Sequence, residues 1–242
     1  FLESYFDFNK CDFIKYSIDN YQFNYIKGTP FHSLYVPTLD TVKYTDILEK
    51  LIRSQVHIFV SGETGVGKTA IVQNILNKLS ETDEFTNMVL NFSATTSSED
   101  AQRNLESKLE KKQGKKVLYG KSGKKLTVFI DDINMPEPEE YGAHPPIELL
   151  RQFLCNGGFY DRPKFFWKKI ETTSLLVAGG PPIGGRSKLT DRFNRHFAII
   201  NVPQADRLNS VFIYENILKG FLNVGNFHDS VKKYCIDTVY AT

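Results

Sequence analysis

The chain has 242 residues, of which 41% are hydrophobic and 24% are charged, and its formal net charge is +2. These values are ordinary for a soluble globular protein, and the length suffices for one large α/β domain with part of a second. The small net charge gives no argument for a nucleic-acid partner, and no apolar run reaches the roughly 20 residues of a membrane-spanning helix.

The first third of the chain contains a lead-in and one predicted helix. Residues 1–35 are rich in aromatic residues and Asn or Asp with weak periodicity, so we expect an irregular lead-in segment. Pro37 to Asp40 then offer helix-start chemistry, and His57 to Val60 form a short apolar run typical of a strand. The apolar positions between them follow helical spacing: Tyr44, Ile47, Leu48, Leu51 and Ile52.

Directly after this strand comes the octapeptide Gly62-Glu63-Thr64-Gly65-Val66-Gly67-Lys68-Thr69. It fits the phosphate-binding loop pattern, in which two glycines flank four residues and are followed by Lys and a hydroxyl residue. Glycines accept positive φ, so that backbone N–H groups can point at an anion at the start of the next helix. We expect Lys68 to reach the β- and γ-phosphates and the Thr69 hydroxyl to ligate Mg²⁺. The alternative is a glycine-rich turn without a ligand.

A second strand, Leu126 to Ile130, ends in two acids, Asp131 and Asp132. Open α/β sheets bind ligands at the carboxyl ends of their strands, so these carboxylates can lie beside the phosphates. We expect Asp131 to hold Mg²⁺ through water and Asp132 to orient the attacking water. The acid pair can alternatively be only a turn signal. Most hydrolytic proteins of this broad class carry the longer Glu in place of Asp132, so slow hydrolysis is expected.

The remaining pattern completes an α/β domain. Five strands that alternate with helices predict a parallel sheet with helices on both faces. The lysine-rich stretch 108–125 is interpreted as a solvated helix end and hairpin. Further strands are predicted at residues 88–92, 174–178 and 197–202, helices at 97–109, 145–156, 189–195 and 205–221, and hairpin inserts at 114–125 and 159–169.

Several longer strings of the sequence are specific enough to indicate a protein family. Residues 129–136 (FIDDINMP), 141–152 (YGAHPPIELLRQ) and 36–44 (VPTLDTVKY) resemble dynein heavy chains within their AAA+ ring. Residues 180–186 (GPPIGGR) and 192–196 (RFNRH) agree with this resemblance. Together the strings are most similar to the third AAA+ module of an axonemal-type heavy chain. They cover roughly residues 30–204.

The resemblance implies a three-layer P-loop AAA+ fold, in which residues 36–204 form the large α/β nucleotide-binding subdomain and residues 205–242 begin a truncated helical lid. It implies a ring of six modules in one chain, with neighbouring AAA+ modules as partners and ATP or ADP with Mg²⁺ as ligands. The third module would be regulatory. Microtubules would be contacted only through other parts of the heavy chain, in the cytoskeleton of a ciliary or flagellar axoneme. We expect neither nucleic acid nor membrane as a partner, and the odd number of widely spaced cysteines favours a reducing cytoplasm.

The resemblance also assigns site residues. Arg192 or Arg195 matches the arginine that reaches the preceding module's nucleotide in trans, although a surface ion pair is the alternative. The expected nucleotide-binding residues are Val36, Pro37, Gly62, Glu63, Thr64, Gly65, Val66, Gly67, Lys68 and Thr69, with Thr69 and Asp131 at the metal and Asp132, Arg192 and Arg195 as catalytic residues.

One position departs from the family pattern. The fourth strand of the family often ends in a polar residue, commonly Asn, that senses the γ-phosphate, and here Gly180 stands at that place. Thr172, Thr173 or Ser174 could supply this polar side chain only in another register of the strand.

In the predicted lid, no arginine can be assigned to the nucleotide. Since the chain begins at Phe1 rather than Met, we expect a piece of a longer polypeptide that binds nucleotide and hydrolyses it poorly, or that binds it without hydrolysis.

Overall fold

A computed structural model describes residues 4–7, 10–18, 21, 23–31, 34–111, 117–225 and 227–241. The chain forms two compact units, of which the larger is Leu48–Pro203 and the smaller combines Phe1–Ile47 with Gln204–Thr242. Helix α1 (Leu39–Arg53) begins in the smaller unit and ends in the larger. Within the described residues, no helix is long and apolar enough to cross a lipid bilayer.

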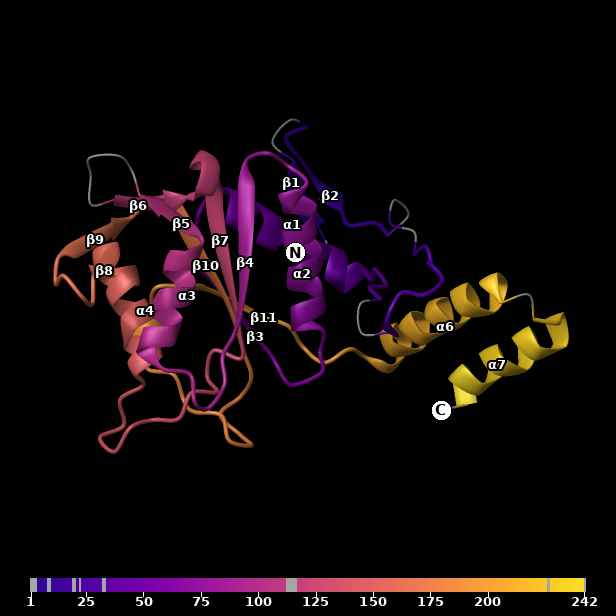
Figure 1. Cartoon of the computed structure of the whole chain (residues 1–242). Helices are drawn as coiled ribbons and strands as arrows, with labels where there is room; N and C mark the ends of the chain where they lie inside the picture. Colours follow the sequence, from indigo (N-terminus) through magenta and orange to yellow (C-terminus); the bar gives the residue numbers. More distant parts are fainter. Residues whose placement is uncertain are drawn as a thin grey trace. The chain divides into compact units, whose positions relative to one another are not determined.

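A five-stranded parallel sheet forms the centre of the larger unit. Helix α2 (Lys68–Ser80) lies on one side of it, and α3 (Ser98–Ser107) and α4 (Pro145–Asn156) lie on the other (Figure 1). The predicted α/β fold is therefore confirmed. In sheet order β11-β3-β10-β7-β4, the strands are β11 (Ala198–Asn201), β3 (Ile58–Ser61), β10 (Thr173–Gly179), β7 (Lys125–Asp131) and β4 (Phe85–Asn91).

The central strands are buried and largely apolar between their ends because helices cover both faces of the sheet. Leu126 to Ile130 of β7 are buried without interruption, as are Leu175 to Ala178 of β10. The polar ends of these strands therefore mark where the sheet meets solvent. The carboxyl ends of β3, β7 and β10 share one edge, since Gly179 of β10 pairs with Ser61 of β3.

The two predicted hairpin inserts join into one four-stranded sheet. Its order is β5 (Leu109–Lys111), β6 (Val117–Gly120), β9 (Trp167–Ile170) and β8 (Gly158–Tyr160), with a parallel pairing between β6 and β9. The first hairpin thus begins before residue 114, and residues 112–116 of the lysine-rich stretch lie outside the described residues. A 3₁₀ turn, η2 (Lys121–Gly123), follows β6.

A buried cation fastens this small sheet to α3. Lys168 is 4% exposed, and its ammonium lies 2.6 Å from an Asp161 oxygen and 2.8 Å from a Glu106 oxygen. Burial opposes the charge, but hydrogen bonds to the two carboxylates hold the pKa of Lys168 above its usual value. The ion pairs therefore keep this side chain charged inside the structure.

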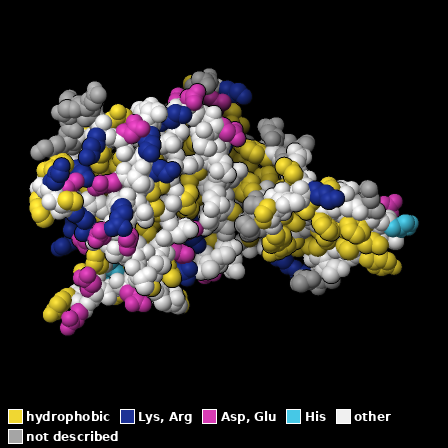
Figure 2. All heavy atoms as spheres, in the orientation of Figure 1, with side chains coloured by type: hydrophobic (Ala, Val, Ile, Leu, Met, Phe, Trp, Pro, Cys, Tyr) yellow, Lys and Arg dark blue, Asp and Glu magenta, His cyan; other side chains and the backbone are white. Residues whose placement is uncertain are grey.

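The smaller unit differs from the predicted lead-in. Instead of an irregular segment throughout, β1 (Ser4–Asp7) and β2 (Asp12–Lys15) form an antiparallel hairpin. The C-terminal part of the same unit contains two helices, α6 (Arg207–Val224) and α7 (Asp229–Ala241), which pack on each other. Hydrophobic side chains gather over this part of the surface in Figure 2. Leu208 of α6 is 79% exposed.

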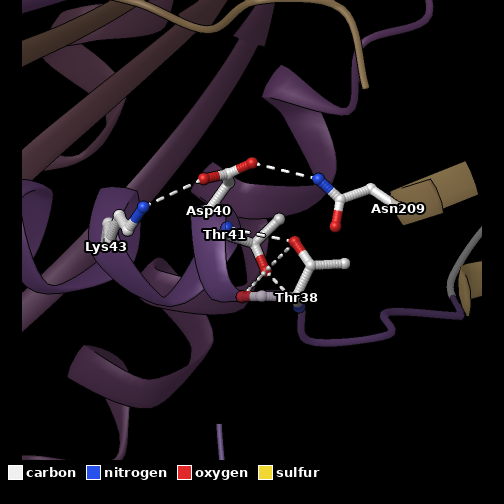
Figure 3. A network of polar contacts seen from close by, with 5 residues as sticks. All are labelled: Thr38, Asp40, Thr41, Lys43 and Asn209. Carbon is white, nitrogen blue, oxygen red and sulfur yellow. Dashed lines mark hydrogen bonds and ion pairs between the residues drawn. The ribbon is translucent and has the colours of Figure 1, made fainter. Parts of the chain in front are cut away.

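A polar network ties α6 to the start of α1 within the smaller unit (Figure 3). The backbone N–H groups of Thr38 and Thr41 each donate to the other residue's hydroxyl, which caps the first turn of α1. Asp40 accepts hydrogen bonds from Lys43 at 3.2 Å and from the Asn209 amide at 3.1 Å. Asp40 therefore links the first turns of the two helices.

His57 predicts a pH dependence of stability for the larger unit. Its Nδ1 accepts the backbone N–H of Leu175 at 3.0 Å, and burial together with the charge of His196 lowers its pKa below the usual value. The unfolded chain therefore binds this proton more readily than the folded one. We expect the free energy of unfolding to fall as pH drops below about 6.5, by at most about 1.4 kcal/mol per pH unit, until the folded pKa is reached.

Denaturant unfolding of the wild type and His57→Asn at pH 7.5 and 5.5 checks this expectation. The variant should be less stable at pH 7.5 and should lose less stability on acidification than the wild type. The pKa of His196 is also lowered, by burial and by Arg195 and Arg151, so some pH dependence should remain. An identical loss in both proteins would contradict the assignment to His57.

Candidate nucleotide-binding site

The predicted phosphate-binding loop lies between β3 and α2, which is the order expected from the sequence. Gly65 and Gly67 adopt positive φ of 84° and 86°, and Gly67 is the N-cap residue of α2. The α2 helix buries Ile71, Val72, Ile75, Leu76 and Leu79, so the sheet fixes the direction of its N-terminus. Backbone N–H groups at the start of a 13-residue helix, together with its dipole, suit an anion at the loop.

The Lys68 side chain turns back toward the first residues of the loop. Its ammonium donates to the carbonyl oxygens of Gly62 at 3.0 Å and Glu63 at 2.6 Å. Burial and the charge of Arg186 lower the pKa of Lys68, while Asp131 and Asp132 oppose this shift. A triphosphate brought to the loop would add the negative charge that this partly buried ammonium favours.

At position 62 the neighbouring backbone lies too close to leave room for any side chain, so glycine is required there. A Cβ atom there would lie 2.4 Å from the carbonyl oxygen of Val202, at a φ of 155°. Because Val202 donates its own N–H to the Ser61 carbonyl at 2.8 Å, the chain after β11 cannot easily move away. Gly65 has a positive φ as well, but among the described residues, its two chain neighbours aside, no heavy atom lies within 4 Å of a Cβ built on it.

We therefore expect Gly62→Ala to lower the free energy of unfolding by about 3 kcal/mol, since it adds a steric clash to backbone strain. Gly65→Ala is the matched control and should lose only about 1 kcal/mol, from backbone strain alone. Urea unfolding followed by circular dichroism measures both values. Equal losses in the two variants would show that the contact with Val202 is not limiting.

The predicted metal ligands lie side by side. The Thr69 hydroxyl donates to Oδ2 of Asp131 at 2.7 Å, across 62 positions of the sequence. Oδ1 of Asp131 accepts the backbone N–H of Asp132 at 3.0 Å, which fixes the carboxylate. A hydroxyl and a carboxylate oxygen in contact, beside a phosphate loop, are the oxygen donors that Mg²⁺ prefers. Thr69 and Asp131 therefore fit the metal that the sequence predicts.

Asp132 has a partner that the sequence analysis did not anticipate. Its backbone is left-handed, with φ of 50°, and its Oδ1 accepts a hydrogen bond from Nη2 of Arg186 at 3.1 Å. The carboxylate predicted to orient water is thus held by a guanidinium. In the sequence, Arg186 belongs only to the family string 180–186. Its place as the one cation of a glycine- and proline-rich stretch is the signal that could have indicated this contact.

The structure settles which residue follows the fourth strand. Gly180 comes directly after β10 and its carbonyl accepts the Asn134 side-chain amide at 2.9 Å. Thr173 pairs with Leu126 at the opposite end of the sheet, so Thr172, Thr173 and Ser174 cannot replace the missing polar side chain. A Cβ atom on Gly180 would lie 3.2 Å from Nε of Arg186.

The two candidate trans arginines lie on and just after α5 (Asp191–Asn194), and both are exposed. Phe193, fully buried between them, anchors the helix. Arg195 donates to the His196 ring at 3.4 Å, whereas Arg192 has no hydrogen bond or ion pair within the described residues. The loop and the acid pair thus come together within the larger unit, while the role of either arginine stays a prediction.

Val36 and Pro37 belong to the smaller unit. Both are buried, and they line a pocket of about 320 Å³ together with aromatic residues of the same unit, including Phe23 and Phe212. Their predicted contact with nucleotide stays a prediction.

Comparisons with known proteins agree with this geometry. A family model described as "P-loop containing dynein motor region" matches residues 23–205. Human dynein axonemal heavy chain 6 is 43% identical over 220 residues, which are 91% of this chain and 5% of that protein. The Dynein-1-beta heavy chain of the flagellar inner arm I1 complex from Chlamydomonas reinhardtii is 42% identical over 205 residues, or 84% of this chain and 4% of that protein.

Human dynein axonemal heavy chain 10 is 41% identical over 203 residues, covering 83% of this chain and 4% of that protein. The chain thus spans only 4 to 5% of the length of these relatives. The family match covers the whole larger unit and part of the smaller one. The chain therefore belongs to the family of P-loop-containing dynein motor regions.

Proposed function

We propose that this chain is the third AAA+ module of an axonemal dynein heavy chain, and that it binds ATP with Mg²⁺, hydrolyses it slowly and regulates microtubule-based movement. The observation that carries the nucleotide and metal binding is the contact between the Thr69 hydroxyl and Asp131, 2.7 Å apart, on a loop whose Lys68 ammonium contacts the Gly62 carbonyl. Phosphate, metal and helix N-terminus can share this one edge of the sheet.

The cellular setting follows from the relatives. Their names place them in axonemes and flagella, which supports a place for this module in the ciliary or flagellar cytoskeleton. Its partners would be the neighbouring AAA+ modules of the same heavy chain. Microtubules would be reached only through other parts of that chain.

A second function, nucleotide binding without hydrolysis, is favoured by two observations. The Asp132 carboxylate is engaged by Arg186 at 3.1 Å, and Gly180 offers no polar side chain to the terminal phosphate. In this case nucleotide would act as a structural ligand between ring neighbours. The two functions share the binding site and differ in whether Asp132 orients water.

Titration of the chain with ATP and ADP, with and without Mg²⁺, tests the binding. We expect saturable binding of both nucleotides and tighter binding of ATP when Mg²⁺ is present, because Thr69 and Asp131 would then act through the metal. Absence of saturable binding would refute both functions. Turnover in an intact heavy chain, compared with its Asp132→Asn variant, separates them, since only hydrolysis at this site should depend on that carboxylate.

A further inference from the structure

Arg186 contacts the candidate site through Asp132, and neither of the functions proposed above gives its guanidinium a contact with nucleotide. Its side chain is 20% exposed, and its Nη2 lies 3.1 Å from Oδ1 of Asp132. The guanidinium therefore lies beside the second acid, at the edge of the sheet where β3, β7 and β10 end and where the terminal phosphate would bind.

The surrounding backbone is shaped around this guanidinium. A Cβ atom on Gly180 would lie 3.2 Å from Nε and 3.3 Å from Cδ of Arg186, so the arginine covers a position that has no side chain of its own. Asn134 holds both flanks of the loop, because its side chain donates to the Gly180 carbonyl at 2.9 Å and its carbonyl accepts the Ser187 N–H at 2.9 Å. The path of residues 180–187 thus places Arg186 over Gly180.

Arg186 has more N–H donors than the oxygen acceptors that it contacts. A guanidinium has five N–H donors, and Nη2 bonds Asp132 through a single oxygen. Nε is buried and has no hydrogen-bond partner in the described part of the chain. A terminal phosphate offers several charged oxygens and can accept two parallel N–H groups, which makes it a stronger partner than this one carboxylate oxygen.

We propose that Arg186 reads the terminal phosphate of ATP in place of the side chain that Gly180 lacks, and that its movement from Asp132 to the phosphate frees Asp132. The inference rests on the proposed nucleotide site. Before ATP binds, the ion pair keeps the Asp132 carboxylate engaged. When the terminal phosphate binds, the guanidinium turns to it, and Asp132 becomes available to accept a hydrogen bond from water. ADP lacks that phosphate and leaves the pair in place.

The test compares nucleotide affinities of the 242-residue chain by calorimetric titration with Mg²⁺. The probes are ADP and a slowly hydrolysed ATP analogue, and the proteins are the wild type, Arg186→Ala and Arg186→Lys. We expect Arg186→Ala to bind the ATP analogue about tenfold more weakly or worse, and ADP within about twofold of the wild type. Arg186→Lys should fall between them, since it keeps the charge and loses the planar fork.

Arg103→Ala is the matched control, because Arg103 also pairs with a carboxylate, Glu99, at 2.6 Å but lies on the exposed surface of α3. It should change neither affinity. Equal weakening of both nucleotides by Arg186→Ala, or no weakening of either, would overturn the role of Arg186. If Arg186→Ala does not fold, an unchanged ATP-to-ADP ratio in Arg186→Lys would overturn it. If the wild type binds neither nucleotide, the proposed nucleotide site itself fails.

Discussion

Replacing Lys68 with Ala should weaken ATP binding about 100-fold or more. Lys68 comes directly after the loop glycines, and its ammonium donates hydrogen bonds to the Gly62 and Glu63 carbonyls. Burial and the charge of Arg186 lower its pKa. Two charge-assisted hydrogen bonds to phosphate, each contributing about 1.5 to 3 kcal/mol, would be lost with it. Each 1.4 kcal/mol corresponds to a tenfold change in affinity, which gives the expected factor.

Lys78→Ala is the matched control for Lys68. Lys78 lies on the same helix, is 57% exposed and pairs with Glu49 at 2.8 Å, away from the loop. It should leave nucleotide affinity within about twofold of the wild type. Fluorescence titration with ATP and ADP in the presence of Mg²⁺ measures all three proteins. An unchanged affinity in Lys68→Ala, in a protein that still folds, would remove the phosphate-loop assignment.

The elements that the sequence predicted correctly are those that local pattern determines. The apolar run 126–130 is buried on both faces in β7, and the glycines of residues 62–67 take the positive φ that the loop pattern demands. Asp131 could be expected near the phosphate loop because parallel strands end at one edge of a sheet. The structure adds the direct hydrogen bond between Thr69 and Asp131, which the sequence did not predict.

Other features depend on contacts between distant segments. The pairing of Leu118 in β6 with Ile170 in β9 joins two inserts that each look like an isolated hairpin. The hairpin at Ser4–Asp7 and Asp12–Lys15 has strands of only four residues, too short to show a clear alternation. Arg186 reaches Asp132 across 54 positions because a loop without helix or strand carries it there. No local period encodes such a path.

Replacement of Arg192, the candidate trans arginine, should have a second large effect, on ATP turnover in the intact heavy chain. Arg192 is exposed on α5 and has no hydrogen bond or ion pair within the described residues, so its guanidinium would be available to the proposed nucleotide of a neighbouring module. Phe193 is fully buried and fixes the helix that carries it. Arg195, three positions on, donates instead to His196 at 3.4 Å. The two arginines are therefore a natural matched pair.

Arg192→Ala in a heavy-chain ring should lower ATP turnover at the preceding module by about 10³-fold or more, because an arginine finger supplies positive charge to the transferring phosphate. Arg195→Ala should change that turnover by much less, since its guanidinium is turned toward His196. Nucleotide affinity of the isolated 242-residue chain should stay unchanged in both variants, because the finger would act on another site. Single-turnover hydrolysis in rings whose other sites are disabled measures the first effect. A loss with Arg195→Ala alone would assign the finger to Arg195, and a loss with neither would leave both arginines as surface residues.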